Sequence, residues 1–388
     1  MATATTTRTS PLADLQALGQ SVWLDFMGRK FVEEGELRRL IEEDDLRGVT
    51  SNPTIFEKAI GHGDEYASAF DELLRGGADG DAIYEGLTVA DIRGALDLFR
   101  PVYDRTDGLD GYVSLEVSPL LAHRTDATLI EARKLWDLID RPNAMIKIPG
   151  TPEGLAAVEE ALFDGINVNV TLLFSVEAYD AVARAYIRAL KRRADLGRPI
   201  DRVASVASFF VSRIDSEVDK RIDTRLRVEP NTGRRAVLQG LRGKAAIANA
   251  KDAYARFRSI FKGPEFAPFE ARGARVQRLL WASVGTKDPA YSDTLYIDEL
   301  IGPDTVSTMP PATFAAFKDH GKVRPSLAED PAGAQATLRN LSELGISMDD
   351  VTSQLLREGV DSFARSFRSL METIAQRRSR LATGGDRG

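Results

Sequence analysis

Short apolar, β-branched runs alternate with longer segments of helical periodicity, and this pattern constrains the fold of the chain more than any other feature. About eight such runs occur, and a helical pattern follows each of them. The expected strands cover residues 21–26, 47–52, 111–117, 143–149, 166–175, 202–210, 276–285 and 304–310. Repeated strand–helix alternation predicts an α/β protein built as a (β/α)8, or TIM, barrel. A doubly wound open sheet is the alternative, but no G-x-G-x-x-G motif follows the first strand.

The chain is longer than a barrel requires. It has 388 residues, whereas a minimal barrel needs roughly 250. The excess lies in helical insertions at residues 53–110 and 213–275 and in a long C-terminal helix. Because no Gly/Ser linker divides the chain, we expect residues 1–388 to form a single domain, with disordered tails at 1–9 and 381–388.

Helix-capping signals indicate where two of these helices begin. After the expected strand 143–149, Thr151 suits an N-cap and Pro152 suits the first helical position. The segment Ser347–Asp350 resembles a capping box and opens the C-terminal helix. One face of that helix is apolar and carries Val351, Leu355, Phe363, Phe367, Leu370 and Ile374.

The composition excludes several classes of protein. The chain has no cysteine, which rules out disulfides and thiol catalysis and is compatible with the cytoplasm, where we expect the protein. Its three histidines do not pair at metal-ligand spacing, so we expect no metal site. The net charge of −7 argues against general affinity for nucleic acid or membranes. No apolar run approaches the roughly 20 residues of a membrane span.

Several expected strands carry polar side chains on one of their two faces. Strands of a barrel are normally apolar on both faces, because both are buried. Here the polar positions lie mostly near the carboxyl ends, where barrel enzymes assemble their sites. They are Asp25, Thr50, Asn52, Ser114, Glu116, Ser118, Lys147, Asn167, Asn169 and Thr171. Taken singly, Asp25 could cap a turn, Asn52 could shape a loop, and Glu116 could be satisfied by backbone amides. Asn169 and Thr171 could form interior hydrogen bonds without any chemistry. Together, the polar positions predict one active site.

Lys147 is the position that a structural role explains least well, because it interrupts the apolar run Ala-Met-Ile-Lys-Ile. A buried lysine loses its proton more readily than an exposed one, and a neutral amine can attack a ketone. The protonated imine that forms is an electron sink, so the neighbouring carbon–carbon bond can break. Such a reaction needs proton shuttles, and the available carboxylates are Glu116 and Asp25.

Five segments of the chain resemble, in order and spacing, the signature segments of transaldolases. They are GVTSNPTIF (48–56), SLEVSP (114–119), IKIPGTPEG (146–154), NVNVTLLFS (167–175) and ASFFVSRID (207–215). The resemblance covers about residues 20–320. It implies a class I, Schiff-base-forming aldolase-type barrel without metal or organic cofactor. It also implies transfer of a dihydroxyacetone unit from sedoheptulose 7-phosphate to glyceraldehyde 3-phosphate in the non-oxidative pentose phosphate pathway.

The resemblance also implies roles for individual residues. Lys147 would form the Schiff base, Glu116 would act as acid and base with a water, and Asp25 would be the aspartate of the first strand. The implied substrate-binding residues are Asn52, Asn169, Thr171, Ser208, Phe210, Arg213, Ser283 and Lys287. Many relatives carry A-S-F-R after the seventh strand, with the arginine binding phosphate. This chain instead reads Ala282-Ser283-Val284-Gly285-Thr286-Lys287, and the lysine would bind as a point charge.

Three other functions compete with this hypothesis. A fructose 6-phosphate aldolase would release free dihydroxyacetone, but such relatives look shorter and replace the residues that stand here as Glu116 and Phe210. A catalytically inactive barrel should have lost Lys147, Glu116 or Asp25. A barrel that binds a nucleotide cofactor would need a Gly-rich fingerprint, which the chain lacks. We expect sugar phosphates as the ligands, and we leave the oligomeric state open, with a homodimer as one candidate.

Overall fold

Eight parallel strands close into a barrel in chain order, with β8 beside β1. The computed structural model describes residues 10–62 and 64–382. The strands are β1 Gln20–Asp25, β2 Gly48–Thr50, β3 Tyr112–Glu116, β4 Ala144–Pro149, β5 Val168–Leu173, β6 Ser205–Phe210, β7 Arg278–Ala282 and β8 Thr305–Met309. Each predicted strand overlaps one of these, so the predicted TIM barrel is confirmed and the open sheet is wrong.

Helices surround the barrel and form the predicted insertions. Those up to β6 are α1 Pro11–Ala17, α2 Arg29–Glu33, α3 Glu36–Glu43, α4 Pro53–His62, α5 Ala67–Arg75, α6 Gly80–Arg105, α7 Thr125–Ile139, α8 Pro152–Asp164 and α9 Val176–Asp195. The later ones are α10 Ser212–Val228, α11 Thr232–Leu241, α12 Ala245–Phe261, α13 Ala267–Glu270, α14 Leu295–Asp298, α15 Pro311–His320, α16 Pro331–Glu343 and α17 Met348–Ala382. Short 3-10 turns lie at Asp64–Tyr66, Pro119–Leu121 and Ser326–Ala328. The insertion after β2 forms α4, α5 and α6, and the one after β6 forms α10 to α13.

The turn after β4 has the predicted cap. The Thr151 hydroxyl accepts a hydrogen bond of 2.9 Å from the Gly154 backbone N–H, and Pro152 opens α8. An N-cap of this kind satisfies a donor that the first helical turn leaves without a partner. The chain therefore leaves the barrel directly after Pro149, and Lys147 lies two residues from the carboxyl end of its strand.

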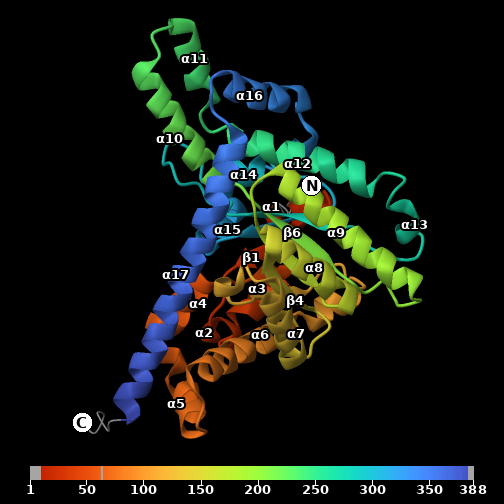
Figure 1. Ribbon diagram of the computed structural model, residues 1–388, viewed down its shortest axis with the longest axis vertical. Helices are drawn as coiled ribbons and strands as arrows, with labels where there is room; N and C mark the ends of the chain where they lie inside the picture. Colours follow the sequence, from red (N-terminus) through yellow and green to blue (C-terminus); the bar gives the residue numbers. More distant parts are fainter. Residues whose placement is uncertain (1–9, 63, 383–388) are drawn as a thin grey trace, which may run out of the picture.

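The C-terminal helix α17 lies along one side of the barrel, next to α4 (Figure 1). The Ser347 hydroxyl accepts a 3.2 Å hydrogen bond from the Asp350 N–H, which confirms the predicted helix start. The predicted apolar face is buried, with Val351 and Leu370 fully enclosed. The helix continues to Ala382 and so includes the first residues of the expected tail; the rest of that tail and residues 1–9 lie outside the described residues.

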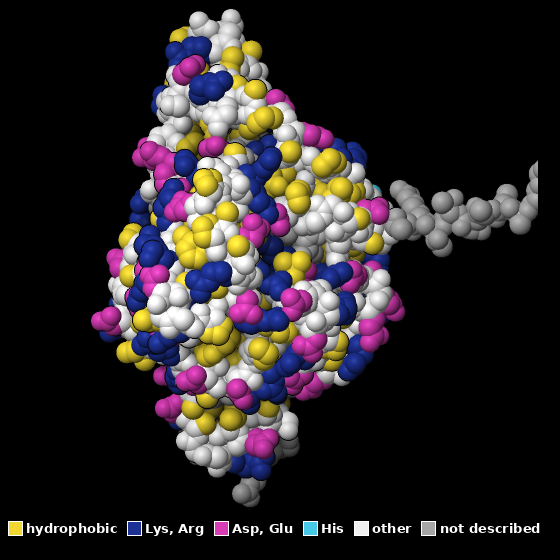
Figure 2. Space-filling view, turned by 90° about the vertical axis from the view of Figure 1, so that its right-hand side faces the viewer, with side chains coloured by type: hydrophobic (Ala, Val, Ile, Leu, Met, Phe, Trp, Pro, Cys, Tyr) yellow, Lys and Arg dark blue, Asp and Glu magenta, His cyan; other side chains and the backbone are white. Residues whose placement is uncertain are grey.

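The surface in Figure 2 carries positive and negative side chains interspersed, with apolar side chains scattered between them. Within residues 10–62 and 64–382, no helix combines the length and the apolar character that crossing a membrane requires.

A buried ion pair lies near the amino ends of the barrel strands. Arg278 on β7 contacts Asp110 at 2.9 Å and also donates to the Ser21 hydroxyl of β1 at 2.7 Å. The Ser21 hydroxyl in turn donates to Asp110 at 2.8 Å. Each charged group therefore has several partners, which an ion pair needs if it is to offset its own desolvation. This network joins β1, β7 and the segment just before β3, at the end of the barrel opposite Lys147.

We expect Asp110→Ala to lower the free energy of unfolding by about 3–5 kcal/mol, because it leaves the Arg278 guanidinium buried without its counter-charge. Urea unfolding followed by circular dichroism measures the change. The matched control is Asp104→Ala, which removes an exposed ion pair with Arg100 and should cost less than about 1 kcal/mol. Equal losses in the two variants would contradict this role for the buried pair.

Candidate active site

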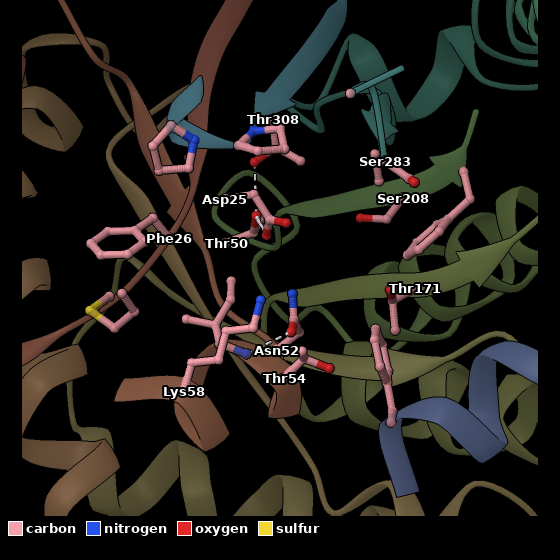
Figure 3. A pocket seen from close by; sticks show the side chains of 18 of the residues that line it. Asp25, Phe26, Thr50, Asn52, Thr54, Lys58, Thr171, Ser208, Ser283 and Thr308 are labelled. Atoms are coloured by element: carbon pink, nitrogen blue, oxygen red, sulfur yellow. Dashed lines mark hydrogen bonds between the residues drawn. The ribbon is translucent and has the colours of Figure 1, made fainter. Parts of the chain in front are cut away.

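A cavity of about 760 Å³ opens at the carboxyl ends of the strands. All of the predicted site residues except Glu116 and Asn169 border it, namely Asp25, Asn52, Lys147, Thr171, Ser208, Phe210, Arg213, Ser283 and Lys287. Figure 3 shows polar side chains from several strands, among them Asp25, Thr171 and Ser208, turned toward the same space. The predicted convergence on one site is therefore observed.

Lys147 and Glu116 form an ion pair in the floor of this cavity. The Lys147 Nζ lies 3.1 Å from the Glu116 Oε2, and both side chains are at most 5% exposed. They meet because β3 and β4 pair in a register that places Glu116 directly beside Lys147, on the same face. Lys147 Nζ also donates a 3.0 Å hydrogen bond to the Ser51 carbonyl oxygen. The amine is thus held in one orientation by β3 and by the segment that follows β2.

Glu116 lies beneath the cavity and has Lys147 as its main electrostatic partner. Burial raises the pKa of Glu116, and the positive charge of Lys147 opposes that rise. Within the part of the chain that the structure describes, no donor makes a well-formed hydrogen bond to either carboxylate oxygen. A carboxylate with free acceptor capacity next to an amine is suited to exchanging protons with it.

Asp25 is held by a chain of hydroxyl groups. The Thr50 hydroxyl donates a 2.6 Å hydrogen bond to Asp25 Oδ1 and lies 2.8 Å from the Thr308 hydroxyl (Figure 3). Asp25 borders the cavity, yet the protein packed around it raises its pKa, while Lys147 and the Thr50 hydrogen bond oppose the rise. Thr308 was not among the predicted site residues. Two-residue alternation along β8 would have placed its side chain on the face opposite that of Met309, among the polar positions.

Asn169 acts from behind the cavity wall. Its side-chain oxygen accepts a 2.7 Å hydrogen bond from the Ser208 hydroxyl, and its amide donates to the Ser114 hydroxyl at 3.1 Å. Asn169 therefore orients Ser208, which does border the cavity. Asn52 has two roles. Its side-chain oxygen accepts a 3.1 Å hydrogen bond from the Ile55 N–H and so caps α4, and the residue also borders the cavity.

A backbone irregularity in β5 lies where the C-terminal helix packs beside the site. The pairing of β5 with β6 shifts between Val170 and Leu173, and Leu172 has a φ of +60°. The Leu172 side chain packs against Gly359 of α17, where a Cβ atom would lie only 2.9 Å from it. One helical turn further on, the Phe363 ring lies 5.7 Å from the Lys147 Nζ and lines the cavity. Phe363 thus contributes an apolar, π-electron-rich wall beside the amine.

The sequence analysis placed Phe363 on a buried helix face but did not assign it to the site. Periodicity identifies the buried face of a helix without indicating what that face contacts. The β5 irregularity was likewise not predicted, because Asn167, Asn169 and Thr171 alternate regularly with apolar residues up to Leu172.

The other end of the cavity is positively charged. Arg213, in the first turn of α10, and Lys287, in the loop after β7, both border it. The Arg213 guanidinium lies 5.4 Å from the Phe210 ring centre. Burial lowers the pKa of both cations, and the charge of Arg213 lowers that of Lys287 further. Two neighbouring cations at the edge of a cavity favour a doubly negative group such as a phosphate.

We expect Asp25→Asn to stabilise the fold at neutral pH. The raised pKa of Asp25 means that the native state holds the carboxylate at a cost, which is fully present above the native pKa and absent below the unfolded value near 3.8. The stability gain of the variant should therefore be largest at pH 7–8 and vanish as the pH falls toward 4. Thermal unfolding across this range measures it.

The matched control is Asp361→Asn, at an exposed position of α17. That variant should change the stability little at any pH. A loss of stability in Asp25→Asn at neutral pH would show that the hydrogen bond from Thr50 outweighs the burial of the charge.

The sequence matches the family model described as "Transaldolase/Fructose-6-phosphate aldolase" over residues 22–374. A protein named transaldolase from Trichodesmium erythraeum is 46% identical over 96% of this chain and 99% of its own length. A protein named transaldolase 2 from a Nostoc species is 48% identical over 94% of this chain and 96% of its own. A transaldolase from Acidothermus cellulolyticus is 47% identical over 95% and 97%. The resemblance noted in five short segments thus extends over nearly the whole sequence, and the chain belongs to the transaldolase/fructose-6-phosphate aldolase family.

Proposed function

We propose that this protein is a transaldolase that transfers a dihydroxyacetone unit from sedoheptulose 7-phosphate to glyceraldehyde 3-phosphate, giving erythrose 4-phosphate and fructose 6-phosphate. The observation that carries the proposal is the buried ion pair of Lys147 and Glu116 in the cavity floor. The full-length relatives that are named transaldolase support it. We further propose that the protein works in the cytoplasm, in the non-oxidative branch of the pentose phosphate pathway.

The first step joins Lys147 to the ketose. Glu116 takes a proton from the Lys147 ammonium across 3.1 Å, which leaves a neutral amine. The nitrogen lone pair attacks the C2 carbonyl carbon, and protons moved by Glu116 turn the carbonyl oxygen into leaving water. The product is a protonated imine, and Glu116 returns to its carboxylate form. Two of the three ammonium protons leave with the water and the third stays on the imine nitrogen, so charge and atoms balance.

The second step breaks the bond between C3 and C4. Asp25 borders the cavity, whereas Glu116 lies beneath Lys147, so Asp25 is the carboxylate that can reach a substrate hydroxyl. It takes the proton of the C4 hydroxyl as the bonding electrons move into the imine, which becomes an enamine. The aldehyde product leaves. The enamine then attacks the acceptor aldehyde, Asp25 returns its proton to the new hydroxyl, and water hydrolyses the imine.

The polar and cationic side chains that line the cavity indicate how the substrate would bind. Thr171 and Ser208 border the cavity, and the Thr171 hydroxyl has no hydrogen-bond partner among the described residues. They are suited to the substrate hydroxyls. Arg213 and Lys287 would hold the phosphate, with the lysine as a point charge beside the planar guanidinium.

We expect borohydride reduction in the presence of fructose 6-phosphate to leave a dihydroxyacetone-derived adduct on Lys147, because hydride traps the imine as a stable amine. Peptide mass mapping locates the adduct. Lys147→Met should carry none, and Lys58, which also borders the cavity, should stay unmodified in both proteins. Without reductant and acceptor, little free dihydroxyacetone should appear. Rapid release of dihydroxyacetone would identify a fructose 6-phosphate aldolase instead.

We expect Glu116→Gln to reduce turnover by about 10²–10⁴-fold, the range for one acid/base group, because an amide cannot accept the Lys147 proton. Steady-state transfer assays measure the loss. Glu131→Gln is the control: the pKa of Glu131 is likewise raised by burial, but the residue does not border the cavity. Near-normal turnover in Glu116→Gln would remove Glu116 from the mechanism.

A further inference from the structure

Two buried carboxylates follow Arg213 on α10, and the proposed mechanism uses neither. Asp215 and Asp219 lie one turn apart and are at most 7% exposed. Burial raises the pKa of both, that of Asp215 to about 7. Holding such groups inside the protein costs free energy unless specific hydrogen bonds offset it. Their partners therefore indicate what they are retained for.

Each carboxylate joins the same two parts of the chain to α10. Asp219 accepts hydrogen bonds from the Gly243 N–H at 3.2 Å and from the Tyr291 hydroxyl at 2.6 Å. Asp215 accepts from the Ala246 N–H at 2.8 Å and from the Tyr296 hydroxyl at 2.9 Å. The two amides belong to the start of α12 or the turn before it. The two tyrosines belong to the segment after β7.

The packing around Tyr291 is specific. Gly243 has a φ of +68°, and a Cβ atom there would lie 2.8 Å from the Tyr291 ring. Glycine is needed at this position both for the backbone conformation and for the close approach of the ring. At the start of the segment after β7, the hydroxyls of Ser212 and Ser283 lie 2.9 Å apart, and the Ser212 N–H donates to the Ser283 carbonyl.

Lys287 lies between these two anchors. Ser283 fastens the start of the loop to the beginning of α10, and Tyr291 and Tyr296 fasten its end further along the same helix. The charge of Arg213 acts on Lys287, so the two cations repel each other in the free protein. The anchors oppose that repulsion. They keep both charges facing one cavity before any anion arrives, which lowers the cost of organising the site on binding.

We propose that Tyr291 and Tyr296, through Asp219 and Asp215, are positioning residues that hold Lys287 beside Arg213 for recognition of the substrate phosphate. The inference rests on the proposed function, and it makes the pair of Arg213 and Lys287 specific for phosphorylated substrates. The tyrosines touch neither the reacting carbon atoms nor Lys147. Their loss should therefore weaken phosphate binding and leave the chemistry at the imine unchanged.

The test compares two acceptors in the full-length enzyme, glyceraldehyde 3-phosphate and unphosphorylated glyceraldehyde. Because the donor and acceptor halves are separated by a covalent intermediate, kcat/KM for the acceptor reports that half alone. Tyr291→Phe should lower kcat/KM for the phosphorylated acceptor by about three- to tenfold, through KM, which is the size of one lost hydrogen bond. The value for glyceraldehyde should change by less than about twofold. Tyr296→Phe provides an independent second measurement with the same expectation.

The matched control is Tyr186→Phe, which removes the hydroxyl of a buried tyrosine that donates to the Val203 and Arg275 carbonyls, near the amino ends of the strands. It should not alter the preference between the acceptors. In a Lys287→Gln background, Tyr291→Phe should have no further effect. The inference is overturned if both acceptors lose equally, if neither changes, or if the effect persists without Lys287. Failure of the proposed function is distinct, because the wild-type enzyme would then transfer no three-carbon unit.

Discussion

The pairing register of β3 and β4 is the constraint on which the site depends. It places Glu116 beside Lys147, and the next pairing, of β4 with β5, places Asn169 on the other side of the lysine. A shift of either strand by one residue would turn these side chains to the opposite face. The ion pair itself gains little stability from burial, because desolvation offsets much of the attraction between the charges. The barrel thus supports a costly pair at one end, while the Arg278–Asp110 network occupies the other.

Much of the site could be predicted because strand alternation depends only on local sequence. Lys147, Glu116 and Asp25 were identified from their positions in apolar runs, and the parallel barrel brought them together at one end. Alternation could not reveal that Glu116 and Asn169 lie behind the cavity surface, because it distinguishes faces but not depth. The place of Phe363 depends on how α17 packs against the barrel, where Leu172 of the β5 irregularity lies against Gly359. Contacts between residues so far apart have no local signal.

The positive end of the cavity differs from the related A-S-F-R pattern in the side chain that supplies its second cation. The segment after β7 offers Lys287, with more backbone between it and Ser283 than in the related pattern. A lysine has a flexible stem and a single point of charge, so the surrounding loop must supply the rigidity that a planar guanidinium would bring with it. The hydrogen bonds from Tyr291 to Asp219 and from Ser212 to Ser283 give that loop fixed points on α10.

The hydroxyl chain at Asp25 links the chemistry to the closure of the barrel. Thr50 belongs to β2 and Thr308 to β8, the strand that closes the ring against β1. Lys147 and Glu116, by contrast, are held by the pairing of β3 with β4. Loosening of β8 would therefore weaken the support of Asp25 while leaving the lysine and its carboxylate together, so the proposed carbon–carbon cleavage would suffer before imine formation.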